Sequence, residues 1–166
     1  MTDPSLRTLL VPTDFSKAAA AAVEYALWLA ARSHANVAFL HVMEPAVYSV
    51  DFALTHPGIS AEVKQGALKA LRNLNDEARS RGVHAETVLT TGTPFAVITS
   101  VAVERKADLI VMGTHGRSGL AHVMLGSTAE RVIRLAPCPV LTVKAEPPGP
   151  GGSPVPEREV GVRAGR

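Results

Sequence analysis

The chain has 166 residues, 46% hydrophobic and 4% aromatic, which is enough for one domain with an apolar core and a tail. Its 17 basic and 15 acidic residues give a net charge of +2, and no Lys/Arg block favours a nucleic-acid partner. The single cysteine, Cys138, excludes an intrachain disulfide, and no apolar run resembles a signal peptide or reaches membrane-span length, so we expect a cytoplasmic protein without a membrane span.

The first half of the chain alternates strand-like and helix-like segments. Residues 6–12 predict a strand, and Ser16 is a suitable N-cap for the helix that follows. Residues 36–43 predict a second strand and residues 59–81 a second helix. Apolar residues at helical spacing predict one buried face on each helix: Val23, Ala26, Leu27, Ala30 and Ala31 in the first, and Ile59, Val63, Ala67, Ala70, Leu71, Leu74 and Ala78 in the second.

The second half continues the alternation. Residues 84–90 alternate in polarity, as a half-exposed edge strand does, and Thr93-Pro94 is typical of a helix start. Residues 108–113 contain four consecutive large apolar side chains, which predicts a central strand covered on both faces. After a glycine-bearing loop over 114–125, a helix begins at Ser127 and a short last strand covers 139–144. The two helices of this half are expected to bury Val97, Ile98, Val101 and Ala102, and Ala129, Val132, Ile133 and Ala136.

This order of elements predicts an α/β fold: a single doubly wound parallel sheet of five strands with helices on both faces, a Rossmann-like architecture. Each crossover between parallel strands should be right-handed. The α/β domain is expected to span residues 1–144.

Two segments predict no regular structure. Residues 145–166 are rich in Pro and Gly with little to bury, and we expect a disordered tail. Residues 44–58 contain Pro45, Pro57 and Gly58. Because this second segment directly follows a strand, it is either a lid over a site or an inert loop, and the sequence does not choose between them.

The ends of the predicted strands indicate where a ligand would bind, because open α/β sheets bind ligands beyond the carboxyl ends of their strands. The glycines around residues 113–126 let backbone N–H groups approach a ligand, and the helix that begins at Ser127 directs its positive end to the same place, as in a phosphate cradle. A purely structural role is equally compatible with the spacing. Ser127-x-x-Glu130 fits a capping box for the helix, and glycines after a strand make ordinary turns.

Three motifs together resemble the universal stress protein family. They are Leu10-Val-Pro-Thr-Asp-Phe-Ser16 near the start, Val111-Met-Gly-Thr-His-Gly-Arg-Ser-Gly-Leu120 with Leu125-Gly-Ser-Thr128, and Cys138-Pro-Val-Leu141. The family's nucleotide-binding members carry Gly, two residues, Gly, nine residues, Gly and then Ser or Thr. Gly113, Gly116, Gly126 and Ser127 match that spacing, and the resemblance covers residues 5–144.

The resemblance implies an adenine-nucleotide site for ATP, with Mg²⁺ carried by the phosphates, and it carries over the following residues. Pro12, Thr13 and Asp14 would border the adenosine, and Val42 would offer backbone hydrogen bonds and an apolar wall to the adenine. Met112 and Gly113 would floor the ribose end, and the phosphates would be held by His115, Gly116, Gly126, Ser127 and Thr128.

The resemblance further implies strand order 3-2-1-4-5 and a homodimer formed through the last strand, Val140–Val143. The nucleotide would be a regulatory ligand in a stress response, with at most slow ATP hydrolysis rather than enzyme turnover. Two alternatives stay open: a nucleotide-free dimeric interaction protein of the same fold, and an enzyme that transfers adenylate. The second would need a signature such as His-x-Gly-His, which the sequence lacks.

The histidines, the segment around Ser118 and the cysteine do not indicate a metal site or a catalytic site. The six histidines show no metal-protease spacing, and Gly116-Arg117-Ser118-Gly119 does not fit the hydrolase pattern G-x-S-x-G. Cys138, between two prolines, is expected to be a small buried apolar side chain rather than a reactive thiol.

Overall fold

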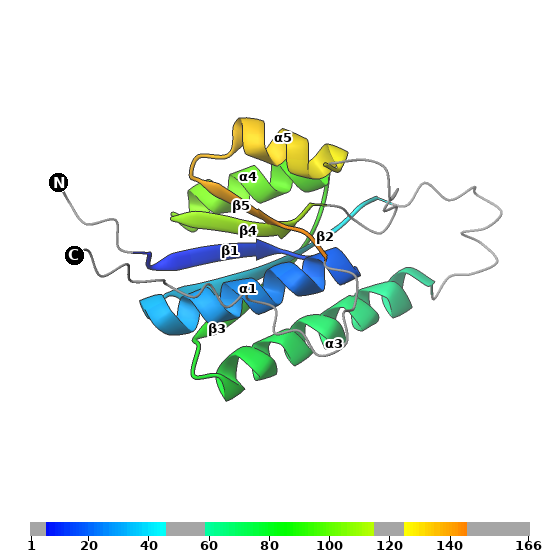
Figure 1. The fold of residues 1–166 in the computed structure, drawn as a ribbon. Coiled ribbons are helices and arrows are strands. Elements are labelled where there is room, and N and C mark those ends of the chain that lie inside the picture. Colours follow the sequence, from blue (N-terminus) through cyan, green and yellow to red (C-terminus); the bar gives the residue numbers. More distant parts are fainter. Residues whose placement is uncertain (1–5, 46–58, 115–124, 146–166) are drawn as a thin grey trace, which may run out of the picture.

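The computed structural model describes residues 6–45, 59–114 and 125–145 (Figure 1). In these ranges five parallel strands form one sheet in the order β3-β2-β1-β4-β5, which confirms the predicted fold class and strand order. The strands are β1 (Thr8–Pro12), β2 (Asn36–Met43), β3 (Ala85–Thr91), β4 (Leu109–Gly113) and β5 (Val140–Val143).

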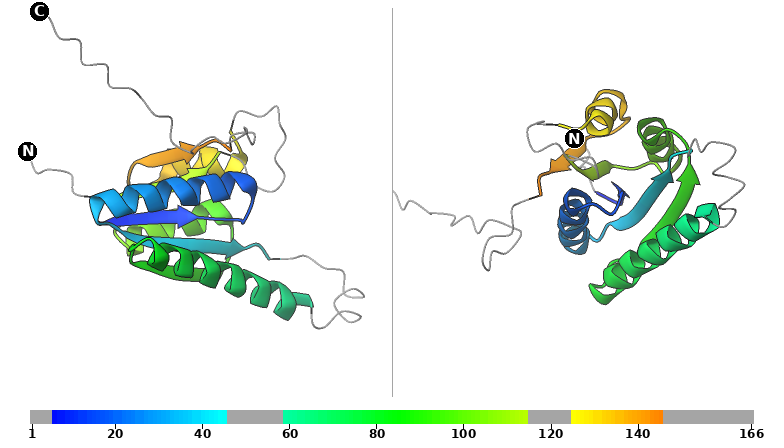
Figure 2. Two further views of the ribbon diagram at one scale, coloured as in Figure 1. Left: turned by 60° about the horizontal axis from the view of Figure 1, so that its bottom comes forward. Right: turned by 90° about the vertical axis from the view of Figure 1, so that its right-hand side faces the viewer.

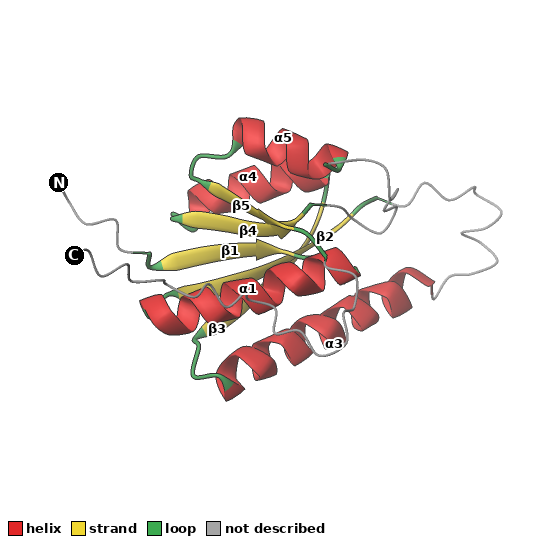
Figure 3. Ribbon diagram, in the orientation of Figure 1, coloured by secondary structure: helices red, strands yellow, loops and turns green. Residues whose placement is uncertain are grey.

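Helices cover both faces of the sheet, as Figures 2 and 3 show. The helices α1 (Lys17–Ser33) and α3 (Ile59–Ser80) lie on one face, and α4 (Pro94–Glu104) and α5 (Ser127–Leu135) lie on the other. Residues alternate between the faces of a strand, so β2 sends Val37 and Phe39 into the core under α1 and Leu40 into the core under α4. The sheet is therefore the middle layer between two separate apolar cores.

The predicted start of α1 is confirmed in atomic detail. Ser16 has extended backbone angles, and its hydroxyl oxygen accepts a hydrogen bond of 3.2 Å from the amide of Ala19. This bond satisfies one of the amides that a helix start leaves unpaired. The helix also packs on α3 through charges, because the Arg81 guanidinium binds the carboxylates of Glu24 and Glu77. The hydrogen bond from Arg81 lowers the pKa of Glu24, whereas burial raises the pKa of Glu77.

Among the side chains that the structure describes, three predicted on buried helix faces are exposed, namely Ala31, Val63 and Ile133. The side chain of Ile59, also predicted on such a face, lies outside the described ones. Val63 lies in the first turns of α3, which extend past the end of β2 in Figure 1, so no sheet covers this side chain. Ile133 is 45% exposed because α5 buries only a narrow face, Ala129 and Val132, at the edge of the sheet. Periodicity gives the direction of a side chain but not whether a neighbouring element reaches it.

The predicted tail from residue 146 onward lies outside the described residues, as do residues 46–58 of the irregular segment. No helix in the described part of the chain is long and apolar enough to cross a membrane.

Candidate functional site

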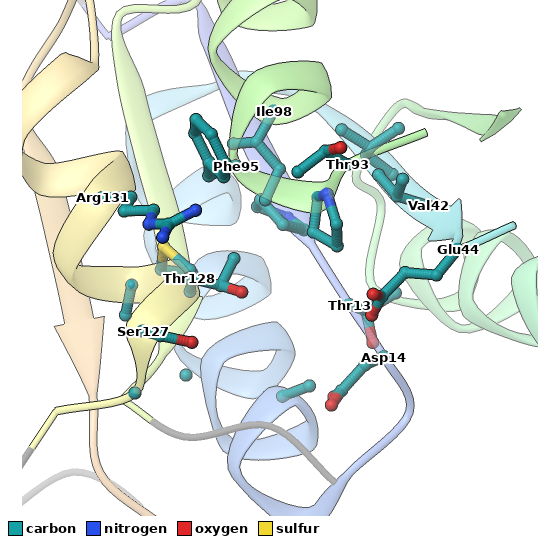
Figure 4. A pocket seen from close by; sticks show the side chains of 18 of the residues that line it. Thr13, Asp14, Val42, Glu44, Thr93, Phe95, Ile98, Ser127, Thr128 and Arg131 are labelled. Atoms are coloured by element: carbon teal, nitrogen blue, oxygen red, sulfur yellow. The ribbon is translucent and has the colours of Figure 1, made fainter. Parts of the chain in front are cut away.

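A pocket of about 590 Å³ opens beyond the carboxyl ends of β1, β2 and β4 (Figure 4). β1 and β4 are adjacent in the sheet, but the chain leaves them in opposite directions, to β2 and to β5. Two open loops therefore diverge at this point, which is where α/β sheets bind ligands. The first turns of α4 and α5 complete the wall on the far side of the pocket.

Nine of the sequence-predicted site residues line this pocket together, although they come from four separate parts of the chain. They are Pro12, Thr13, Asp14, Val42, Met112, Gly113, Gly126, Ser127 and Thr128. The remaining two predicted residues, His115 and Gly116, lie outside the described residues.

The turn between β1 and α1 presents Thr13 and Asp14 to the pocket, and hydrogen bonds fix its shape. The Thr13 amide donates to the carbonyl of Leu40 at 2.8 Å, which ties the turn to β2. The Thr13 hydroxyl oxygen accepts from the amide of Phe15 at 3.1 Å, and Asp14 Oδ1 accepts from the amide of Ser16 at 3.0 Å. Side-chain bonds of this local kind hold a turn in one conformation.

The contact between β4 and α1 leaves no room for a side chain at Gly113. A Cβ atom at this position would lie 2.8 Å from the backbone carbon and 2.9 Å from the carbonyl oxygen of Ala18 in α1. Both distances are far below ordinary van der Waals contact, so any side chain would push α1 away from β4. The first glycine of the sequence motif is therefore required by the helix–strand contact as well as available to a ligand.

The start of α5 differs from the predicted capping box. Gly126, not Ser127, is the N-cap, and no side chain caps this helix end. The Gly126 amide donates to the carbonyl of Thr114 at 2.8 Å, which ties the helix start to the end of β4. Ser127 is the first helical residue, and its hydroxyl lines the pocket instead of closing the helix. The capping interpretation is wrong because the chain enters the helix one residue earlier than the box requires.

The start of α4 has the same property. Thr93 is its N-cap but makes no side-chain cap hydrogen bond, and Thr93, Pro94 and Phe95 all line the pocket. Two helix N-termini without side-chain caps thus border one cavity, whereas α1 is capped by Ser16. Helix N-termini carry partial positive charge and N–H donors, so this side of the pocket suits an anion.

The charged side chains among the described lining residues are divided between two sides. Asp14 and Glu44 follow β1 and β2, and Arg131 belongs to α5, across the pocket in Figure 4. The Arg131 guanidinium carbon lies 4.8 Å from the centre of the Phe95 ring, a cation–π contact that holds the cation at the pocket wall. The pocket therefore has an acidic side and a cationic side.

Several lining residues were not predicted as site residues, chiefly Glu44, Thr93, Phe95, Ile98 and Arg131. Glu44 comes right after β2, so the rule of strand ends was sufficient to find it. Arg131 lies four residues after Ser127, and that spacing places both on one face of a helix. The α4 residues give no such signal, because only the packed structure brings α4 to the cavity.

Cys138 is half-buried, and burial together with the charge of Asp108 raises the pKa of its thiol. A raised pKa lowers the thiolate fraction, which agrees with the predicted unreactive thiol.

Comparisons with known proteins give a consistent result. A model of the universal stress protein family matches residues 5–144. The universal stress protein YxiE of Bacillus subtilis is 38% identical over 144 residues, which cover 82% of this chain and 97% of that protein. The solved structure of MJ0577, a universal stress protein of Methanocaldococcus jannaschii, superposes with a TM-score of 0.77 at 27% identity, covering 86% of this chain and 98% of that one. A universal stress protein solved in complex with cAMP has a TM-score of 0.62 and 30% identity, with 86% and 99% coverage.

Proposed function

Because this chain belongs to the universal stress protein family, we propose that it binds an adenine nucleotide, ATP in particular, as a regulatory ligand in a stress response. The observation that carries the proposal is the division of the pocket. Acidic side chains border one side, and two helix N-termini without side-chain caps and Arg131 border the other. A nucleotide has matching ends: hydroxyl and amino donors on the nucleoside, and negative charge on the phosphates.

The ligand would lie across the pocket with its adenosine near Thr13, Asp14 and Val42. Carboxylates accept hydrogen bonds, so Asp14 would receive a ribose hydroxyl, and Val42 and Pro12 would give the base an apolar wall. Met112 and Gly113 would lie under the ribose. The phosphates would face Gly126, Ser127 and Thr128, with His115 and Gly116 from the loop outside the described residues. The related structure with cAMP supports an adenine ligand at this fold.

The nucleotide would be sensed rather than consumed rapidly, with at most slow hydrolysis. Fast hydrolysis needs a base placed to activate a water molecule beside the terminal phosphate. Asp14 would lie at the adenosine end of the ligand, and its Oδ1 accepts a hydrogen bond from the amide of Ser16 at 3.0 Å, so this carboxylate serves the turn. Mg²⁺ would enter with the phosphates, because it is typically bound through substrate phosphate oxygens.

Titration calorimetry with ATP, with Gly126→Val as the key variant, tests the proposal. Gly126 has φ −72° and ψ 152°, which valine also adopts, so the backbone tolerates the change, and the added side chain would occupy the proposed cradle. Gly66→Ala is the matched control, because Gly66 is exposed on α3 with nothing near its Cβ position. We expect micromolar ATP binding that Gly126→Val weakens at least ~10-fold and the control leaves unchanged. Equal affinity of wild type and Gly126→Val contradicts the cradle.

A folded wild-type protein that binds no nucleotide supports the second function instead, that of a nucleotide-free interaction protein acting through its dimer surface. Among the described residues β5 is the last strand at its end of the sheet, and its outer edge is the surface we propose for a homodimer. The carbonyl of Pro139 accepts from the amide of Ile110 in β4, and the carbonyl of Val143 accepts from the amide of Thr114, which directly follows β4. Backbone groups alternate along a strand, so the amide and carbonyl of Thr142 face the free edge, where a second copy would pair.

Sedimentation of wild type and Thr142→Pro tests this surface. Proline removes an outward amide without touching the bonds to β4, so the fold should persist while the pairing is lost. We expect a dimer for wild type and a monomer for the variant, with equal helix signals by circular dichroism. A monomeric wild type, or a dimeric Thr142→Pro, contradicts pairing through β5.

A further inference from the structure

One buried histidine lies directly beside the candidate site without lining it. His41 is on β2, pairs in register with Leu89 of β3, and is 8% exposed. Side chains alternate along a strand, so His41 lies on the same face as Val37 and Phe39, toward α1. Its neighbours Leu40 and Val42 point to the other face and line the pocket.

His41 makes a short hydrogen bond to the turn that presents Thr13 and Asp14. Its Nδ1 lies 2.7 Å from the carbonyl oxygen of Thr13. A carbonyl oxygen only accepts, so Nδ1 must carry a proton and donate. The geometry thus fixes the protonated nitrogen of the ring. The Thr13 amide is bonded to Leu40 at 2.8 Å, so β2 holds Thr13 by both of its backbone groups.

The His41 imidazole also contacts Phe15, which lies two residues after Thr13 in the same turn. Phe15 has φ +63°, a left-handed conformation that is uncommon for a bulky side chain and costs free energy. Its ring lies 4.5 Å from the His41 ring, with 36° between the planes. The conformation persists only where the surroundings hold it, and His41 contacts both the start of the turn and its strained residue.

We propose that His41 is a positioning residue for the nucleotide site, holding the β1–α1 turn in the conformation that presents Thr13 and Asp14 to the ligand. This inference rests on the proposed function. His41 does not touch the ligand, and its effect passes through the carbonyl of Thr13 and the ring of Phe15. It sets how well the adenosine end of the site is ordered before the ligand arrives.

Two substitutions separate the roles of the imidazole. His41→Asn keeps an N–H donor close to the place of Nδ1 but loses the ring. His41→Phe keeps a ring against Phe15 but loses the N–H donor, so the Thr13 carbonyl loses its hydrogen bond from residue 41. We expect His41→Phe to weaken adenosine and ATP by the same factor, ~10-fold, and His41→Asn to stay within ~3-fold of wild type. An equal factor for both ligands locates the defect at the nucleoside end, away from the phosphates.

Two NMR measurements need no ligand. Long-range proton–nitrogen spectra should show the His41 ring with Nδ1 protonated, the signal being assigned by its loss in His41→Asn. Amide exchange of Phe15 and Ser16 should be at least ~10-fold faster in His41→Phe than in wild type, while an amide in the centre of β1, such as Leu10, keeps its rate.

The outcomes distinguish failure of this inference from failure of the proposed function. If wild type binds no nucleotide, the proposed function fails, and amide exchange alone decides whether His41 holds the turn. If wild type binds ATP and His41→Phe binds it equally well, His41 is not a positioning residue. The inference is also overturned if Nδ1 carries no proton, or if both variants lose affinity only in proportion to a general loss of stability.

Discussion

Replacing Gly113 by alanine tests whether this motif glycine is fixed by packing. The added Cβ would lie 2.8 Å from the backbone carbon of Ala18 and 2.9 Å from its oxygen. Carbon atoms in contact normally lie about 3.5–4.0 Å apart, so α1 must retreat from β4 by several tenths of an ångström. The obstacle is backbone, which cannot rotate away as the end of a side chain can.

The structure sets the magnitude of this effect. α1 buries Ala19, Ala22, Val23, Ala26, Leu27 and Ala30 against the sheet, so a shift of the helix disturbs the contacts of all these side chains. Protein cores are close-packed and absorb such shifts poorly. Forcing extra atoms into such a core typically costs about 1–3 kcal/mol of unfolding free energy. We expect Gly113→Ala to lose this amount.

Urea unfolding followed by circular dichroism, without nucleotide, measures the loss. Gly66→Ala is the control, because Gly66 lies inside α3 with nothing within 4 Å of its Cβ position. Alanine suits a helix better than glycine, so this variant should gain about 0.5–1 kcal/mol. The two Gly→Ala changes therefore have opposite expected signs. If Gly113→Ala unfolds at the wild-type urea concentration, Ala18 does not exclude a side chain there and the packing argument is refuted.

Three further predictions follow from single contacts. Arg131→Met should weaken ATP about 10-fold and adenosine far less in calorimetry, because in the proposed arrangement the lost cation would face the phosphates. The exposed Arg134→Met should change neither affinity, and equal losses of both ligands in Arg131→Met would contradict this role. Arg81→Met should cost at most about 1 kcal/mol at pH 7, since the pair is half-exposed and screened by solvent. Arg81 lowers the pKa of Glu24 below its usual 4.5, so in urea unfolding the difference from wild type should shrink as the pH falls below that value and Glu24 is protonated. Cys138 should react with iodoacetamide at pH 8 more slowly in the folded protein than in the protein unfolded by urea, because burial raises the pKa of its thiol. Equal rates in the two states would contradict the burial of this side chain.

The fold could be predicted from the sequence because its signals are local. Four consecutive apolar residues in β4 indicate a strand covered on both faces, and the alternating residues of β3 indicate an edge, where the structure places them. The Ser16 cap was readable for the same reason, since the hydroxyl and the amide that it accepts are only three residues apart. The resemblance implied Thr13, Val42 and Gly113 as site residues, and the structure brings them to one pocket because parallel strands end at the same edge of the sheet.

Only the tertiary structure determined the contacts between segments that are far apart in the chain. The sequence left a capping box and a phosphate cradle equally compatible with Ser127. In the structure Gly126 is the N-cap of α5, so Ser127 does not cap the helix. The cation–π contact of Arg131 with Phe95 and the hydrogen bond of His41 to Thr13 join residues on different elements. Periodicity records which way a side chain points along its own helix or strand. Whether another element lies there, as for Arg131, or solvent does, as for Ile133, is set by how the layers pack.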